Sequence, residues 1–135
     1  MSPIVKNILA VIVGIVIGGM FNMGLIMISG SIIPPPGGVD PSNMESLKAN
    51  IHLFEAKHFI FPFIAHALGT LVGAFLTTKI AATNHLKMAL IIGFWFLLCG
   101  IMAANMLPAP MWFNALDLIV AYIPMAFLGY KLARK

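Results

Sequence analysis

The sequence HLFEAKHFIFPFIAHALGT, residues 52–70, decides how this chain is organised, because it passes from a polar segment into a long apolar one. It holds three of the four histidines and one of the four acidic residues. Apolar residues continue beyond it to about residue 80, which is long enough for a helix that crosses a bilayer. Pro62 favours a kink or a fresh helix start near the beginning of this helix. We therefore expect a membrane span over about residues 59–80, entered from a water-exposed loop.

The composition excludes an ordinary soluble domain. The 135 residues are 61% hydrophobic and 9% charged, whereas soluble domains carry roughly 25% charged residues. A soluble fold of this size could not hide so much apolar surface, so lipid is the expected solvent. The net charge of +4 is small and scattered, which argues against nucleic acid as a partner. The single cysteine, Cys99, excludes an intramolecular disulfide and is expected to be a small buried apolar residue.

Three further apolar segments predict three more spans, over about residues 4–29, 86–107 and 111–130. Pro124 lies inside the last segment and predicts a kink. The first segment is longer than the apolar part of a signal peptide and no cleavage motif follows, so we expect it to be retained. The predicted fold class is an all-α integral membrane protein: a four-transmembrane-helix bundle in which residues 1–135 form a single membrane domain.

The first outward loop is expected to contain an extra amphipathic helix over about residues 41–57. Asp40 is predicted to be its N-cap and Pro41 its first helical residue. Apolar residues then recur at the three- and four-residue spacing of a helical stripe, namely Met44, Leu47, Ile51 and Phe54. We expect this helix to cover the outer end of the spans.

Small residues recur at four-residue spacing in the first two spans. Gly14 and Gly18 lie on one face of the first span, and Gly69 and Gly73 on one face of the second. Small residues let two helix backbones approach closely. We expect this packing to occur within the bundle, although the same faces would also suit a larger membrane partner.

Positive charges predict the orientation in the membrane. If the N-terminus is inside, the inner loops and ends hold six basic residues and the outer loops hold two, which is the bias of cytoplasmic loops. We therefore expect both termini in the cytoplasm, in a bacterial inner membrane. The six residues are Lys6, Lys79, Lys87, Lys131, Arg134 and Lys135, and the two are Lys48 and Lys57.

Two ionisable residues, His66 and Asp117, lie inside the apolar spans, where a charged group is costly and is a functional candidate. Each lies about eight residues below the outer end of its span, or on the order of 12 Å deep. A buried carboxylate needs a partner, and His66 is the one at the same depth. We predict a ligand-binding or proton-relay site of His66, Asp117, Asn22 and Asn114. The alternative is that His66 and Asp117 form a hydrogen-bonded pair that only joins two helices.

A metal site is a second prediction from the same region. His52 and Glu55 are three residues apart on one helix face, a spacing that metal ligands use in helical bundles. His58 is rotated away from them and joins only if the helix is distorted. A divalent metal held by His52, Glu55, His58 and His66 is therefore considered, against the alternative of a solvated polar face.

The leading functional hypothesis is a small inner-membrane protein whose outward polar cavity binds or passes a small ligand, a metal ion or a proton. One alternative is a structural or accessory subunit of a larger membrane complex. Another is a membrane enzyme acting on a lipid or quinone with His66 as base. The bilayer is the expected partner in each case, with a homo-oligomer or a larger membrane protein as further partners.

Overall fold

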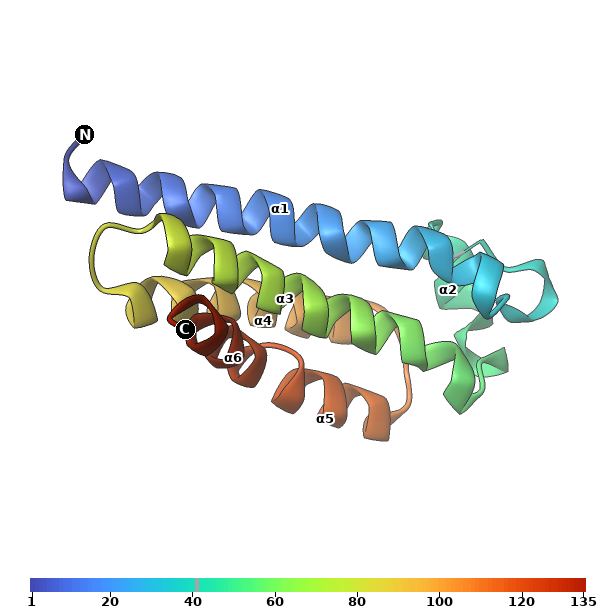
Figure 1. Ribbon diagram of the computed structural model, residues 1–135. Coiled ribbons are helices and arrows are strands. Elements are labelled where there is room, and N and C mark those ends of the chain that lie inside the picture. Colours follow the sequence, from blue (N-terminus) through green and yellow to red (C-terminus); the bar gives the residue numbers. More distant parts are fainter. Residues whose placement is uncertain (41) are drawn as a thin grey trace.

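The computed structural model describes residues 1–40 and 42–135, and helices and turns account for its regular structure, with no strand in these two ranges. The helices run roughly alongside one another in a bundle, with both termini at one end (Figure 1). The helices are α1 (Pro3–Ile32), α2 (Met44–Asn50), α3 (Ile60–Ile80), α4 (His85–Met106), α5 (Met111–Val120) and α6 (Ile123–Ala133), and the 3-10 turns are η1 (Pro36–Gly38), η2 (Ile51–Leu53) and η3 (Ala56–Phe59).

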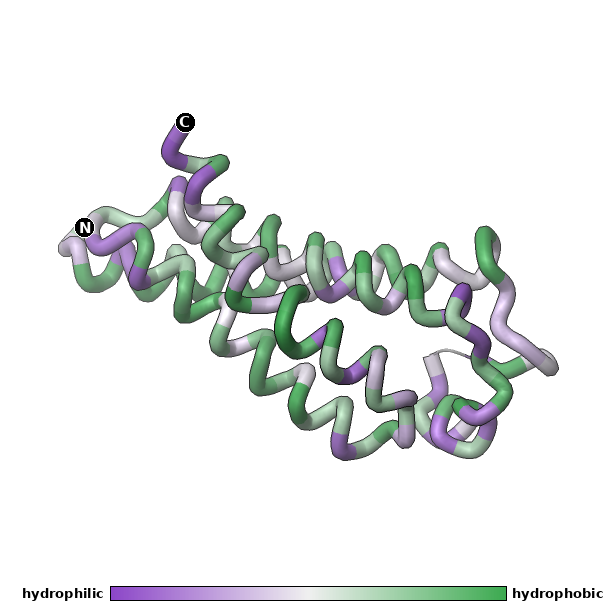
Figure 2. Tube along the Cα trace, turned by 90° about the horizontal axis from the view of Figure 1, so that it is seen from below, coloured by the Kyte–Doolittle hydropathy of each residue, from purple (hydrophilic) through white to green (hydrophobic). Residues whose placement is uncertain are grey.

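Among the described residues, four helical segments are long and apolar enough to cross a membrane, at about the positions predicted from the sequence. They are Pro3–Ile32, Ala56–Ile80, His85–Met106 and Met111–Ala133. Hydrophilic residues gather at the two ends of the bundle, and the helices between them are mostly hydrophobic (Figure 2). Large apolar side chains remain exposed along these helices, as expected for a surface that faces lipid rather than water.

The α1 and α3 backbones meet at four glycines. A Cβ atom added to Gly14 would lie 2.7 Å from the carbonyl oxygen of Gly73, and one added to Gly73 would lie 2.7 Å from that of Gly14. Gly18 and Gly69 approach each other in the same way, at 2.7 and 2.9 Å. The predicted close packing within the bundle is therefore confirmed, and the faces that a larger partner was considered to use are occupied by the chain's own helices.

The last span is two helices rather than one kinked helix. α5 ends at Val120 and α6 begins at Ile123, with Pro124 in the first turn of α6. Proline has no N–H to donate to the carbonyl four residues earlier, which here belongs to Val120. The irregularity predicted at Pro124 is present, but as a break between two helices rather than a kink in one, and this break gives Tyr122 a position that a regular helix would not.

The predicted helix over residues 41–57 is wrong in extent, because α2 covers only seven residues, Met44–Asn50. The backbone is extended at Phe54 and Glu55, with ψ angles of 132° and 172°. Glu55 donates its backbone N–H to Nδ1 of His58 at 2.8 Å and so begins a new turn, η3. This local capping bond competes with continuation of the helix.

The predicted cap of that helix is also wrong. Asn43 is the N-cap of α2, and its side-chain oxygen accepts from the Ser46 amide at 3.1 Å. Asp40 instead accepts bonds from the hydroxyl and amide of Ser42, at 2.6 and 3.0 Å. These bonds, the hydroxyl bond first, hold the pKa of Asp40 below its ordinary value. The predicted role of Pro41 lies outside the described residues.

The segment between α1 and α3 nevertheless packs against the end of the bundle. Ile51 is buried against Phe59 and Phe113, which come from η3 and α5. This apolar contact holds the loop over the space between α3 and α5, where it forms one wall of a cavity.

At the opposite end, Asn7 of α1 ties down the turn between α3 and α4. Its side-chain oxygen accepts from the amides of Ala82 and Thr83, at 2.8 and 3.3 Å. Its side-chain nitrogen donates to the Thr83 hydroxyl at 3.0 Å. The side chain thus serves three backbone or side-chain groups of a tight connection.

Asn7→Ala is expected to lower the free energy of unfolding by about 1–2 kcal/mol, because three partly exposed hydrogen bonds are lost. SDS titration in mixed micelles, followed by circular dichroism, measures the change, and amide exchange at Ala82 and Thr83 locates it. Asn105→Ala, at an exposed asparagine near the other end of α4, is the matched control. Equal effects from the two substitutions would contradict the assignment.

Candidate functional site

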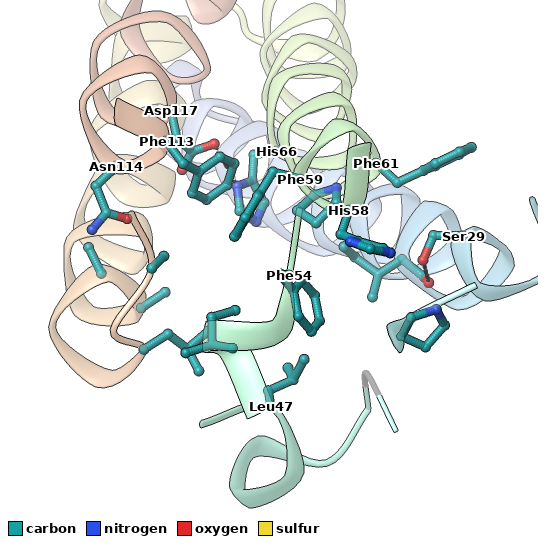
Figure 3. A pocket seen from close by; sticks show the side chains of 18 of the residues that line it. Ser29, Leu47, Phe54, His58, Phe59, Phe61, His66, Phe113, Asn114 and Asp117 are labelled. Carbon is teal, nitrogen blue, oxygen red and sulfur yellow. Dashed lines mark hydrogen bonds and ion pairs between the residues drawn. The ribbon is translucent and has the colours of Figure 1, made fainter. Parts of the chain in front are cut away.

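A cavity of about 200 Å³ lies at the end of the bundle covered by α2, η2 and η3, and we call it the outer cavity. Its walls are mostly apolar and come from α1, the α1–α3 segment, α3, α4 and α5. Figure 3 shows phenylalanine rings around it, with His66 and Asp117 deeper among the helices. Asn114 lies on the same side of the cavity as Asp117 (Figure 3).

Aromatic rings build one wall of the outer cavity. The ring centroids of Phe59 and Phe113 are 4.6 Å apart, and those of Phe54 and Phe59 are 5.7 Å apart. Trp112 meets the edge of Phe59 at 5.7 Å. Rings at these distances attract one another and have few rotatable bonds, so the wall is formed before any ligand arrives.

His66 and Asp117 form the floor of the outer cavity, and the contact predicted from their depths is present. Nδ1 of His66 lies 2.8 Å from Oδ1 of Asp117, across the interface of α3 and α5. Asp117 is 4% exposed, whereas His66 is only half-buried and lines the cavity. The carboxylate of Asp117 is thus buried, and the imidazole of His66 is the side chain of the pair that is more accessible to a ligand.

Tyr122 completes this group and was not predicted. Its hydroxyl donates to Oδ2 of Asp117 at 2.9 Å, and its ring stacks on His66 with centroids 6.0 Å apart. On a regular helix, residues 117 and 122 would be rotated by about 140° from each other. The break between α5 and α6 brings them together, and Pro124 was the one signal in the sequence that pointed to it.

The three side chains orient the imidazole. Oδ2 of Asp117 accepts a hydrogen bond from Tyr122, and Oδ1 lies against Nδ1 of His66. An ionised carboxylate only accepts, so with Asp117 in that form Nδ1 of His66 is the donor and Nε2 is the ring nitrogen left to accept a hydrogen bond. Within residues 1–40 and 42–135, no other side chain bonds to Nε2. Nε2 therefore has no partner among the described residues, and His66 lines the cavity, so a ligand there can bond to it.

A smaller cavity of about 100 Å³, the inner cavity, lies on the other side of His66. Asn22 lines it, and the side-chain oxygen of Asn22 is buried with no hydrogen-bond donor in the part of the chain that the structure describes. The four predicted site residues are thus divided, because Asn114 lines the outer cavity and Asn22 the inner one. Cys99 also lines the inner cavity but is exposed, which corrects the expectation that it is buried.

The predicted metal ligands are not brought together. Among the described residues, no group of three or more His, Cys, Asp or Glu side chains is placed to hold a metal ion. His52 is exposed, and His58 uses Nδ1 to accept the Glu55 amide. The carboxylate of Glu55 lies 3.8 Å from Lys57. The prediction required one distorted helix, whereas the chain forms two separate turns, and His66 lies deeper in the bundle with Asp117.

The site therefore combines an apolar, aromatic cavity with one accessible imidazole held by a buried carboxylate. Such an arrangement can bind an apolar molecule and accept a hydrogen bond, or a proton, from it. A comparison with protein-family models, with curated proteins and with solved structures finds no match to this chain.

Proposed function

We propose that the protein binds a small, largely apolar molecule in the outer cavity and accepts a hydrogen bond from it at Nε2 of His66. The observation that carries this proposal is the distribution of polarity around the cavity. Apolar and aromatic side chains form most of its lining, and the polar groups lie at its floor and rim. A ligand of the same character, apolar with one polar group, leaves the fewest groups without a partner.

The size of the cavity indicates the size of the ligand. An apolar cavity of about 150 Å³ accommodates benzene, and the outer cavity measures about 200 Å³. A single ring with one hydrogen-bond donor, such as a phenol or a quinol head group, therefore fits. Any longer tail would extend out of the cavity along the apolar surface of the helices. This ligand class narrows the broader prediction of a small ligand, metal ion or proton.

The membrane is the proposed setting for this binding. We place the protein in a bacterial inner membrane with both termini in the cytoplasm and the outer cavity on the far side. The support is the six-to-two bias of basic residues, together with termini that share one end of the bundle (Figure 1). A ligand dissolved in the outer leaflet would then reach the cavity without crossing the bilayer.

Phenol and toluene test the proposal because they have nearly the same shape and differ by one donor. In nanodiscs, the wild-type protein is expected to bind phenol about tenfold more tightly than toluene, as one hydrogen bond to a buried acceptor implies. His66→Phe removes the acceptor and keeps an aromatic ring, so it should abolish the preference while toluene still binds. Ligand-observed NMR, corrected for partitioning into empty nanodiscs, measures both affinities.

His52→Phe is the matched control, because His52 is exposed and lies outside the cavity lining. It is expected to leave the preference for phenol unchanged. Equal binding of the two compounds by the wild-type protein would refute the proposed role of His66. If neither compound shows saturable binding, the proposed ligand site is refuted, and the alternative of a structural or accessory subunit is favoured.

One observation favours a second function, in which His66 is a base that removes a proton from the bound molecule. A buried carboxylate on Nδ1 orients the ring, fixes its tautomer and stabilises the protonated imidazole. This arrangement is present at His66 and Asp117. It supports the enzyme alternative acting on a lipid or quinone, with the phenol or quinol hydroxyl as the group that loses the proton.

A further inference from the structure

A second concave surface lies at the opposite end of the protein, between the first turns of α4 and the last turns of α6. This groove has a volume of about 640 Å³ and is open to the surroundings. Two basic side chains line it, Lys87 from α4 and Arg134 from the residue that follows α6, and Tyr130 of α6 lines it as well. Figure 1 shows the C-terminal turns of α6 next to the start of α4.

The electrostatic environment of this groove is positive. Of the four acidic residues of the chain, Asp40, Glu45 and Glu55 lie in the α1–α3 segment at the other end, and Asp117 is buried at His66. No basic side chain at the groove end forms an ion pair with any residue in the two described ranges. The positive charge there is therefore not neutralised within the chain, and a bound anion would be stabilised.

The start of α4 adds to this field. Asn84 precedes the helix in the left-handed conformation, at φ 51°, and provides no side-chain cap. The first backbone N–H groups of the helix consequently have no capping side chain, and they lie at the positive end of the helix dipole. His85 is held in place by a 2.9 Å contact between its Nδ1 and the Thr78 carbonyl, which keeps this turn against the bundle.

The part of the groove that follows α4 away from the basic residues is apolar. Leu86, Leu90 and Phe94 are four residues apart and so follow one face of α4 away from the basic end. Leu86 and Phe94 are exposed. A headgroup-sized basic region thus continues into an apolar strip that runs along the helix, in the direction of the bilayer core.

We propose that this groove is a binding site for an anionic phospholipid, with the phosphate between Lys87 and Arg134 and an acyl chain along Leu86, Leu90 and Phe94. Arginine and lysine at a helix boundary bind phosphate through charge-assisted hydrogen bonds, and basic pockets between helices on the cytoplasmic side bind anionic headgroups. The zwitterionic headgroup of phosphatidylcholine gains less from the same field. This inference does not depend on the outer cavity or its ligand.

Native mass spectrometry of the detergent-solubilised full chain tests the site by titration with phosphatidylglycerol and phosphatidylcholine of the same acyl composition. The wild-type protein is expected to bind phosphatidylglycerol at least about tenfold more tightly. The double variant Lys87→Gln/Arg134→Gln should lose most of that preference. Lys79→Gln/Lys131→Gln removes the same charge from the same end and should keep it, because these two lysines lie over Phe75 and Phe127 rather than in the groove.

Three results would overturn the proposal. Equal losses in the two double variants would show that diffuse surface charge, not the groove, selects the lipid. Equal binding of the two lipids by the wild-type protein would show that the apolar strip alone is responsible. Displacement of phosphatidylglycerol by inorganic phosphate would show a simple anion site.

Circular dichroism melting curves establish that each variant is folded. Phe94→Ala, which keeps every charge, should also weaken lipid binding if the acyl chain follows α4.

Discussion

Gly14→Ala is expected to lower the free energy of unfolding by about 3–5 kcal/mol. The new Cβ would collide with the Thr77 hydroxyl and would lie 2.7 Å from the Gly73 carbonyl oxygen. That carbonyl belongs to the backbone of α3 and can move only if the two helices separate. The Thr77 hydroxyl also donates to the Ala10 carbonyl at 3.1 Å in a fully buried position, so its displacement breaks an interhelical bond.

Gly19→Ala is the control for this prediction. Nothing lies within 4 Å of a Cβ atom added at Gly19, and alanine is the better residue in a helix interior. SDS titration in mixed micelles should therefore give unchanged or slightly higher stability for Gly19→Ala. If Gly14→Ala is as stable as Gly19→Ala, α1 and α3 do not pack in the membrane as they do in this structure.

Asp117→Leu is expected to lower the free energy of unfolding by about 3 kcal/mol or more. The substitution removes the acceptor of both His66 and Tyr122 and leaves two polar groups unpaired in the bundle. Tyr122→Phe removes one of the two bonds and should cost about 1 kcal/mol. Because both side chains bond to Asp117, the double variant should be less unstable than the sum of the single effects.

Asn114→Leu is the control for Asp117→Leu. Asn114 lies one turn earlier on the same helix, lines the outer cavity and has no side-chain hydrogen bond to any residue that the structure describes. Its replacement should change stability by less than about 0.5 kcal/mol. An Asp117→Leu variant as stable as Asn114→Leu would mean that the buried hydrogen bonds do not hold α3, α5 and α6 together.

The two proposed ligands bind at opposite ends of the bundle, and the reason lies in the distribution of polar groups. The outer cavity has an imidazole held by a buried carboxylate, and the acidic side chain favours a hydrogen-bond donor over an anion. The groove at the other end has basic side chains without acidic neighbours, which favours an anion. His66→Phe and Lys87→Gln/Arg134→Gln should therefore affect phenol and phosphatidylglycerol binding independently.

Several features could be predicted from the sequence because they depend on local chemistry. Apolar segments long enough to cross a bilayer predicted four helical spans, and residues 1–40 and 42–135 contain four such helical segments. Pro124 marked the place where the last of them breaks. Depth along a helix follows from residue spacing alone, so His66 could be chosen as the partner of Asp117. Glycines at four-residue spacing marked the faces where α1 and α3 meet.

Other features depended on the tertiary structure. The predicted helix over residues 41–57 followed an apolar repeat, but the capping bond between Glu55 and His58 divided that segment into separate turns. The arrangement assumed for the metal site, with His52, Glu55 and His58 on one distorted helix, is therefore not present in the described residues. A periodic pattern gives the face of a residue only while the helix stays regular.

The sequence by itself therefore determined the four long apolar segments, the position of each polar residue along them and the polar residues that need partners, because length, hydropathy and the cost of a buried charge are properties of single segments. Only the tertiary structure decided how these residues meet. The rotation of each helix about its axis, and the change of direction at the α5–α6 break, placed Tyr122 on Asp117 and separated Asn22 from Asn114. The rotations and the change of direction are fixed by contacts between segments that are distant in the chain, such as the close approach of Gly14 and Gly73. The sequence of a single helix does not contain this information.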